Sequence, residues 1–86
     1  MKMSELEQEI QMFFRSFALQ TLQEAKADAT NPRAVKQAML DYYEEIYPAF
    51  ARTDIFKACP EGSADYETMV EAYKQNFSLL LEGRIP

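Results

Sequence analysis

Apolar residues recur at three- and four-residue steps through the first third of the chain, and this period predicts a helix. At about 100° per residue the positions fall on one stripe. Ser4 and Glu7 fit a capping box, so we expect the helix to begin at Ser4 and to run to about Asp28. The stripe consists of Leu6, Ile10, Phe13, Phe14, Phe17, Thr21 and Ala25.

A second helical pattern starts at Asn31 and Pro32, because asparagine is a good N-cap and proline is tolerated at the first helical position. Pro48 lacks a backbone donor, and its ring clashes with the carbonyl four residues earlier. We therefore expect this helix to end or bend at Pro48. Its apolar face consists of Val35, Ala38, Met39, Tyr42, Tyr43 and Ile46.

The rest of the chain predicts one short and one long helix. Thr53 can cap a short helix, which the turn residues of 59–62 close. A long helix then begins near Ser63 to Asp65, and Gly83 is a natural stop at its C-terminal end. Its apolar stripe is Tyr66, Met69, Val70, Tyr73, Phe77, Leu80 and Leu81.

No stretch alternates with a period of two for long enough to indicate a strand, so the sequence predicts an all-α fold. We expect a small antiparallel bundle of three long helices, with a short extra helix between the second and third. Residues 1–86 are expected to form a single helical domain.

The small size raises the question of what stabilises the fold. A domain of 86 residues has a thin core and is often reinforced by disulfides, a metal or a partner chain. Cys59 is the single cysteine and histidine is absent, so one chain can build neither an internal disulfide nor a zinc site. The remaining ways to stabilise the fold are close helix packing and association with another chain.

The net charge of the chain and its hydropathy argue against two classes of binding partner, nucleic acids and membranes. The net charge of −5 argues against direct binding of nucleic acid. No apolar run approaches the ~20 residues of a membrane span. The first residues contain no hydrophobic signal region, and a lone free cysteine suits a reducing cytoplasm, so we expect a cytoplasmic protein.

The residues usual in catalysis are scarce. Without histidine the common general base is missing, and Cys59 has no base to activate it. Two carboxylate pairs, Glu5 with Glu9 and Glu67 with Glu71, stand four residues apart and are expected to face outward. We therefore expect no enzyme, no cofactor and no metal.

The segment DYYEEIYPAF, residues 41–50, combines aromatic and acidic residues. A helical wheel places Tyr42 and Ile46 toward the core. Three further apolar residues widen the apolar arc beyond the ~100° that a core-facing stripe requires, namely Leu40, Tyr43 and Tyr47. Either the short helix covers this flank or a tyrosine-rimmed surface is exposed for contact. The acids Asp41, Glu44 and Glu45 form a solvated face, or they meet a basic target.

The first helix also carries two apolar residues away from its phenylalanine stripe. Met12 and Leu19 lie seven residues apart, which is the spacing of a seam between helices. Single exposed apolar residues are common and need no explanation. The spacing nevertheless makes Met12 and Leu19 candidates for contact with a partner or with a second copy of the chain.

Two short segments resemble known families. In size, acidity and helix content the chain resembles colicin-type immunity proteins, and Ile46-Tyr47-Pro48 is similar to their tyrosine–proline segment. The serine–aspartate lead-in is absent and the order of elements is shifted. Asn31-Pro32 before a helix is similar to type III secretion needle subunits, which are a single helical hairpin. No residue role is carried over from either family.

These observations favour a non-enzymatic protein–protein interaction module: a regulator, an adaptor or an inhibitor. The partner is a protein, the same chain, or both, with no direct nucleic acid and no membrane. The alternative is a structural homo-oligomer whose exposed apolar residues complete an interchain core. The candidate contacts are Met12, Leu19, Leu40, Tyr43, Tyr47, Asp41 and Glu44.

Overall fold

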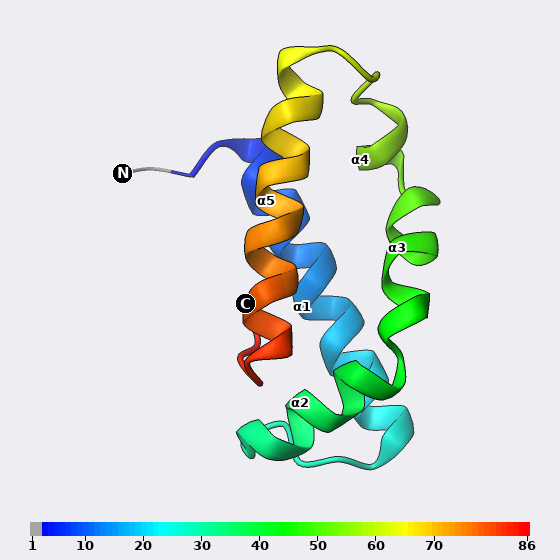
Figure 1. The fold of residues 1–86 in the computed structure, drawn as a ribbon, viewed down its shortest axis with the longest axis vertical. Helices are drawn as coiled ribbons and strands as arrows, with labels where there is room; N and C mark the ends of the chain where they lie inside the picture. Colours follow the sequence, from blue (N-terminus) through cyan, green and yellow to red (C-terminus); the bar gives the residue numbers. More distant parts are fainter. Residues whose placement is uncertain (1–2) are drawn as a thin grey trace.

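The computed structural model describes residues 3–86, and every regular element in that range is a helix (Figure 1). The predicted all-α class is therefore confirmed. The predicted set of three long helices is confirmed only in part, because the second is divided into two shorter ones. The helices are α1 (Glu5–Ala25), α2 (Pro32–Asp41), α3 (Tyr43–Ala51), α4 (Asp54–Lys57) and α5 (Ala64–Leu81).

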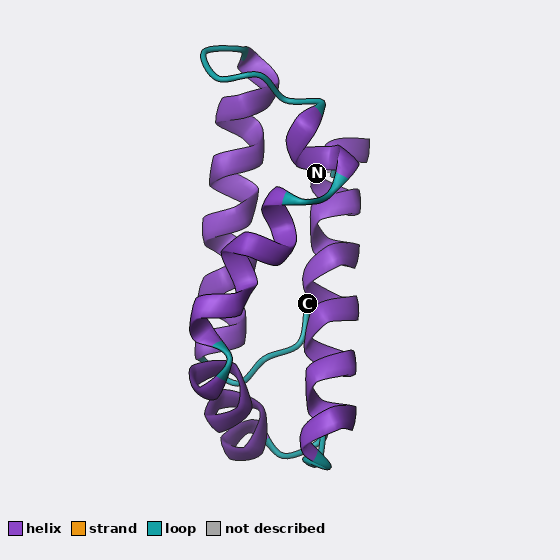
Figure 2. Ribbon diagram, turned by 90° about the vertical axis from the view of Figure 1, so that its right-hand side faces the viewer, coloured by secondary structure: helices purple, strands orange, loops and turns teal. Residues whose placement is uncertain are grey.

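The two long helices form the frame of the domain. Figure 1 shows α1 and α5 running side by side in the same direction, with α3 running the opposite way and α2 lying across one end. In Figure 2, α3 lies in front of the seam between α1 and α5. The domain spans 38 × 29 × 15 Å, so it is a slab about two helices thick, since packed helix axes are ~8–10 Å apart.

The predicted N-terminal caps are present. The Ser4 Oγ atom accepts the Glu7 amide at 3.2 Å, and a Glu7 carboxylate oxygen accepts the Ser4 amide, which completes the capping box. The side chains of Asn31, Thr53 and Ser63 cap α2, α4 and α5 in the same way. Because each cap joins residues two or three apart, local sequence defines these helix starts.

The division between α2 and α3 corrects the prediction about Pro48. The chain leaves helical geometry at Tyr42 (φ −108°, ψ 19°), and Pro48 lies inside α3. This break lets α2 cross the end of the slab while α3 returns along it (Figure 1). Pro48 is tolerated because it removes one backbone hydrogen bond, to the carbonyl of Glu44, which is an exposed residue and can bind water instead.

The core is apolar, with two polar residues from the long helices. Asn76 is buried, and its side-chain amide donates to the Ala72 carbonyl at 2.8 Å. Thr21 of α1 is the other buried polar residue among those described. The buried apolar residues are Ile10, Phe14, Ala18, Leu22, Val35, Ala38, Met39, Ile46, Phe50, Cys59, Met69, Ala72 and Leu80.

The buried faces of α1 and α5 are rotated from the predicted stripes. In α1, Ala18 and Leu22 are buried, whereas Ala25 is exposed. In α5, Ala72 and Asn76 face the core, and several predicted core residues lie half-buried at its edge. Those half-buried residues are Tyr66, Val70, Tyr73, Phe77 and Leu81. Small buried residues in both helices allow α1 and α5 to lie close together.

The C-terminal ends of the two long helices have the same hydrogen-bond arrangement, with Lys26 after α1 at the left-handed position that Gly83 takes after α5. Helix α1 ends at Ala25, three residues before the predicted Asp28, because Lys26 adopts the left-handed conformation (φ 55°). Helix α5 ends at Leu81, and the predicted stop residue Gly83 follows its C-cap with φ +85°. The amide of Gly83 donates to Leu80 and that of Arg84 donates to Leu79, which is the Schellman arrangement.

Candidate functional site

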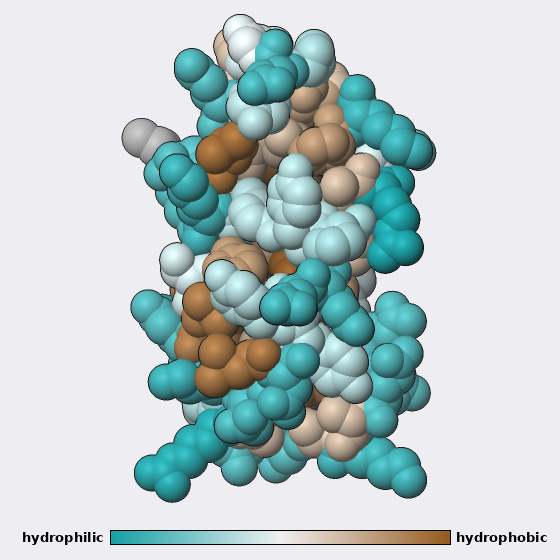
Figure 3. All heavy atoms as spheres, turned by 45° about the vertical axis from the view of Figure 1, so that its right-hand side comes forward, coloured by the Kyte–Doolittle hydropathy of each residue, from teal (hydrophilic) through white to brown (hydrophobic). Residues whose placement is uncertain are grey.

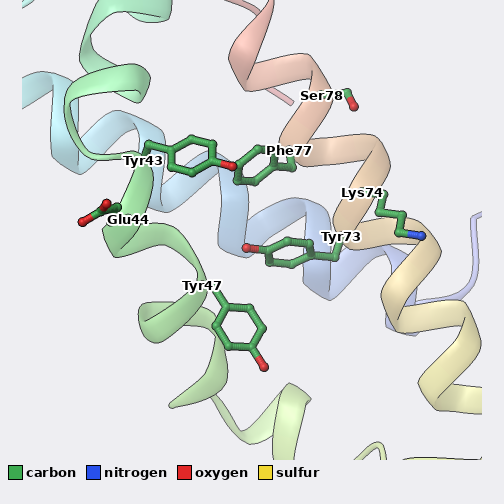
Figure 4. Close-up of a pocket in the computed structure, with 7 residues that line it drawn as sticks. All are labelled: Tyr43, Glu44, Tyr47, Tyr73, Lys74, Phe77 and Ser78. Atoms are coloured by element: carbon green, nitrogen blue, oxygen red, sulfur yellow. The ribbon is translucent and has the colours of Figure 1, made fainter.

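A groove opens between α3 and α5, and its walls come from residues far apart in the sequence (Figure 4). Its volume is about 540 Å³. Helix α3 contributes Tyr43, Glu44 and Tyr47 to the groove, and α5 contributes Tyr73, Lys74, Phe77 and Ser78. We call this feature the aromatic groove.

Ring contacts hold the two walls of the aromatic groove together. The ring centroids of Tyr43 and Phe77 are 5.4 Å apart, in an edge-to-face arrangement. The Tyr47 and Tyr73 centroids are 6.2 Å apart, also edge to face. Within the α5 wall, Tyr73 stacks on Phe77 with centroids 5.8 Å apart. Such pairs contribute about 0.5–1.5 kcal/mol each beyond their area burial.

Phe50 links the aromatic groove to the core. It is buried, and its ring centroid lies 5.1 Å from that of Tyr73 and 5.2 Å from that of Phe13. It also contacts Phe14 and Phe56. The Tyr73 side of the groove therefore rests on a buried ring that three other rings also contact.

A second hollow continues the aromatic groove toward α4. The two share Tyr47, Tyr73 and Lys74 as lining residues. The second hollow has a volume of about 230 Å³ and is mostly apolar, with Phe56 on the α4 side and Val70 on the α5 side. Together the two hollows form one apolar track between the helices.

The charges beside the aromatic groove differ between its walls. On the α3 side the exposed carboxylates of Asp41, Glu44 and Glu45 lie around a further hollow next to Tyr43. On the α5 side the charged residue of the lining is Lys74. In Figure 3, apolar and near-neutral side chains lie down the middle of the face and hydrophilic side chains lie along both edges.

Burial in the aromatic groove raises the pKa of the Tyr73 hydroxyl to about 12, with the neighbouring Tyr47 and Tyr43 as smaller causes. A buried phenolate would lose hydration, so the neutral form is favoured. Tyr73 is therefore a neutral hydrogen-bonding group at physiological pH, and a binding surface can use it as a donor or acceptor.

The structure gathers five of the seven predicted contact residues around the aromatic groove. Tyr43 and Tyr47 are 51% and 56% exposed, and they form its α3 wall together with Glu44. Leu40 is 48% exposed and lies in the adjoining hollow with Asp41. The short helix does not cover this flank: Phe56 of α4 contacts the Tyr47 ring but leaves the tyrosine exposed.

The other two predicted contacts lie elsewhere. Met12 is 66% exposed in a separate hollow between α1 and α4, where Phe13, Ile55 and Ala58 also lie. Leu19 is 41% exposed on α1, seven residues further along the chain. Neither residue lines the aromatic groove, so the candidate contacts form two surfaces.

The α5 wall of the aromatic groove was not predicted as a site. Tyr73 and Phe77 lay within the apolar stripe of their helix and were assigned to the core. Lys74 and Ser78, four residues apart, were not singled out. The apolar pattern of α5 carries no signal for this wall, because Tyr73 and Phe77 fall in the middle of the predicted stripe.

Groups for covalent or metal chemistry are not assembled within the described residues. Cys59 is buried near the start of α5, and burial raises the pKa of its thiol, with Asp65 and Glu9 adding to the effect. Across residues 3–86, acidic and thiol side chains form no group of three placed to hold a metal ion.

None of the helices formed by residues 3–86 combines the length and apolar character needed to cross a membrane. Comparison with protein-family models, with curated proteins and with solved structures yields no match to this chain.

Proposed function

We propose that the protein is a non-enzymatic protein–protein interaction module, acting as a regulator, adaptor or inhibitor through the aromatic groove. The observation that carries this proposal is that Tyr43 and Tyr47 stay more than half exposed while they form the groove wall. Tyrosine is enriched at interfaces because its rigid ring supplies apolar area and its hydroxyl supplies a hydrogen bond. The cytoplasmic location expected from the sequence is part of this proposal.

The neighbouring exposed residues suit the periphery of such an interface. Interfaces combine an apolar centre with a polar rim. Leu40 extends the apolar surface at one end, and Asp41 and Glu44 lie beside it. We assign the centre of the contact to the two tyrosines with Tyr73 and Phe77.

The experiment that tests this proposal is affinity capture from a lysate of the source organism, with mass spectrometry of the eluate. The groove variant carries Tyr43→Ser and Tyr47→Ser. The matched control carries Met12→Ser and Leu19→Ser, which removes comparable exposed apolar surface on α1. Circular dichroism and the urea midpoint establish that both variants fold before the comparison is made.

Three outcomes distinguish the possibilities. The proposal is supported if the wild type and the control capture a protein that the groove variant does not capture. A protein lost only by the α1 variant overturns the aromatic groove as the site. Recovery of nothing beyond background, with a monomeric chain, contradicts an interaction module.

A second candidate function is a structural homo-oligomer, and the exposed Met12 and Leu19 favour it. Two apolar residues seven apart on one helix face are spaced to pack against a second helix. Sedimentation velocity at micromolar concentration tests this reading. A folded monomer contradicts it, whereas an assembly that Met12→Ser and Leu19→Ser dissociate supports it.

A further inference from the structure

We propose that the occupant of the aromatic groove is an amphipathic helix of a partner protein, with basic residues along the side that faces α3. This inference rests on the proposed function and adds the chemistry of the partner to it. Three features carry it: the shape of the track, the absence of a strand to extend, and the unequal charge of the two walls.

The shape suits a helix laid between α3 and α5. The aromatic groove and the hollow beside Phe56 share Tyr47 and Tyr73, so they form two adjacent apolar subsites. Helices that bind in grooves insert apolar anchors at positions i, i+4 and i+7. At about 1.5 Å per residue these anchors span ~10 Å, which is within the ~14 Å length of a nine-residue helix such as α3.

The other common way of binding a peptide requires an exposed strand edge. An extended peptide gains its main-chain hydrogen bonds by adding to a sheet. Every regular element of residues 3–86 is a helix, so the described chain presents no such edge. A helical ligand satisfies its own backbone and needs only the side-chain contacts that the aromatic groove supplies.

The charges along the two walls of the aromatic groove indicate which charges the partner helix carries. Asp41, Glu44 and Glu45 place three carboxylates within five residues along the α3 side, and all three are exposed. Within the described residues the ion pair found joins Arg84 to Glu82, so these three carboxylates have no cationic partner there. Basic residues on the facing side of the ligand complement them and speed association. Lys74 on the opposite wall favours an acidic residue on the other side, which orients the helix.

A second copy of the chain fits this charge pattern poorly. Its net charge is −5, so two copies repel each other before contact. The exposed stripe of α1 is the segment that would have to enter the groove, because it carries Met12 and Leu19. Glu9 lies beside Met12 in the same hollow, and the exposed Arg15 follows on the same side of α1, so the charge of this stripe is mixed and does not supply a flank that is basic throughout.

A selection from a defined peptide library tests the inference. The full chain is immobilised, and displayed 16-residue helical peptides carry leucine at i, i+4 and i+7. Flanking positions are randomised among Lys, Arg, Gln, Asp and Glu. We expect Lys and Arg to be enriched over Asp and Glu along one flank, and the groove variant with Tyr43→Ser and Tyr47→Ser to lose binding at least about tenfold.

Two charge variants distinguish the effect of the acids beside the groove on peptide binding from the effect of the protein's net charge. Replacing Asp41→Asn, Glu44→Gln and Glu45→Gln should weaken binding of the best basic peptide about tenfold, since three exposed charge pairs with the peptide are lost together. The control with Glu9→Gln, Glu24→Gln and Glu61→Gln has the same net charge and alters exposed acids outside the aromatic groove. We expect it to bind within about twofold of wild type.

The failures of this inference and of the proposed function are distinguishable. Groove binders with an acidic or unbiased flank overturn the basic-helix inference, while the interaction module stands. The basic-helix inference is also overturned if the two groove tyrosines are needed to capture a partner from lysate but the peptide selection enriches no helical peptide. The interaction module stands in that case as well. A dimer that the groove variant dissociates makes a second copy the occupant and overturns the inference.

Discussion

The carbonyl group of Pro32 occupies the position that a side chain on Gly83 would need. A Cβ atom added to Gly83 would overlap the Pro32 oxygen and lie 2.9 Å from its carbonyl carbon. The end of α5 and the start of α2 therefore meet backbone to backbone. Gly83 also has φ +85°, which L-residues with a Cβ rarely adopt.

Gly83→Ala should lower the free energy of unfolding by about 2–4 kcal/mol, because backbone strain and overlap add. Gly62→Ala is the matched control: Gly62 has φ +89°, and nothing lies within 4 Å of its added Cβ. That variant should lose only the strain of about 1 kcal/mol. Urea unfolding followed by circular dichroism measures both, and equal losses would contradict the close contact with Pro32.

Lys26→Gly should stabilise the protein by about 0.5–1 kcal/mol. Lys26 ends α1 with φ 55°, and a residue with a Cβ pays ~1 kcal/mol there that glycine avoids. Lys26→Ala removes the same charge but retains the Cβ, so it should leave the urea midpoint nearly unchanged. An increase of the midpoint in the alanine variant equal to that in the glycine variant would show that the charge, not the conformation, is responsible.

The stability of the fold should fall between about pH 10 and pH 12 through Tyr73. Its pKa is raised to about 12 in the folded state. The unfolded phenol has a pKa of about 10, so the unfolded chain releases this proton first as the pH rises. The contribution of Tyr73 is therefore complete below pH 10 and is lost as the pH approaches 12.

Tyr73→Phe should make the decline in the urea midpoint between pH 9 and pH 12 shallower. Tyr42→Phe, outside the aromatic groove, serves as the matched control for removal of a tyrosine hydroxyl. Absorbance at 295 nm gives a second readout, in which Tyr73→Phe should remove the highest tyrosine titration step. An unchanged titration curve in that variant would exclude Tyr73 as the late-titrating group.

Cys59 should react slowly with thiol reagents in the native protein. It is buried, and burial raises the pKa of its thiol, so the reactive thiolate is scarce. We expect the reaction with Ellman's reagent at pH 8 to be at least about tenfold slower than in denaturing urea. Equal rates would show that the thiol is accessible in the folded chain.

The sequence predicts those features of the fold that depend on local chemistry. Ser4, Asn31, Thr53 and Ser63 cap helices because a cap joins residues close together in the chain. Gly83 ends α5 because glycine adopts a positive φ without strain. The exposure of Met12, Leu19, Leu40 and Tyr47 also follows from helical periodicity, since they lie outside the apolar stripes. Tyr43 is the exception, because the apolar face predicted for its helix includes it although it is 51% exposed.

The break at Tyr42 and the α5 wall of the groove depend on tertiary packing. Tyr42 is no helix breaker, and it ends α2 because the chain must turn there to return along the slab. Pro48 is a breaker, yet α3 accommodates it at the cost of one backbone bond. Tyr73 and Phe77 line the aromatic groove because Ala72 and Asn76 take the core-facing position, and this rotation has no signature in the apolar pattern of α5 alone.

The attachment of α3 has a consequence for how the groove moves. Its backbone packs mainly against α4, and it reaches the long helices through inserted side chains such as Ile46 and Phe50. Its start at Tyr42 lacks a side-chain cap, and Pro48 removes one of its backbone bonds. Segments with few protecting contacts open at a lower free energy than the whole domain. We therefore expect the amide hydrogens of α3 to exchange with solvent before those of α5, so that one wall of the groove opens while the other stays folded.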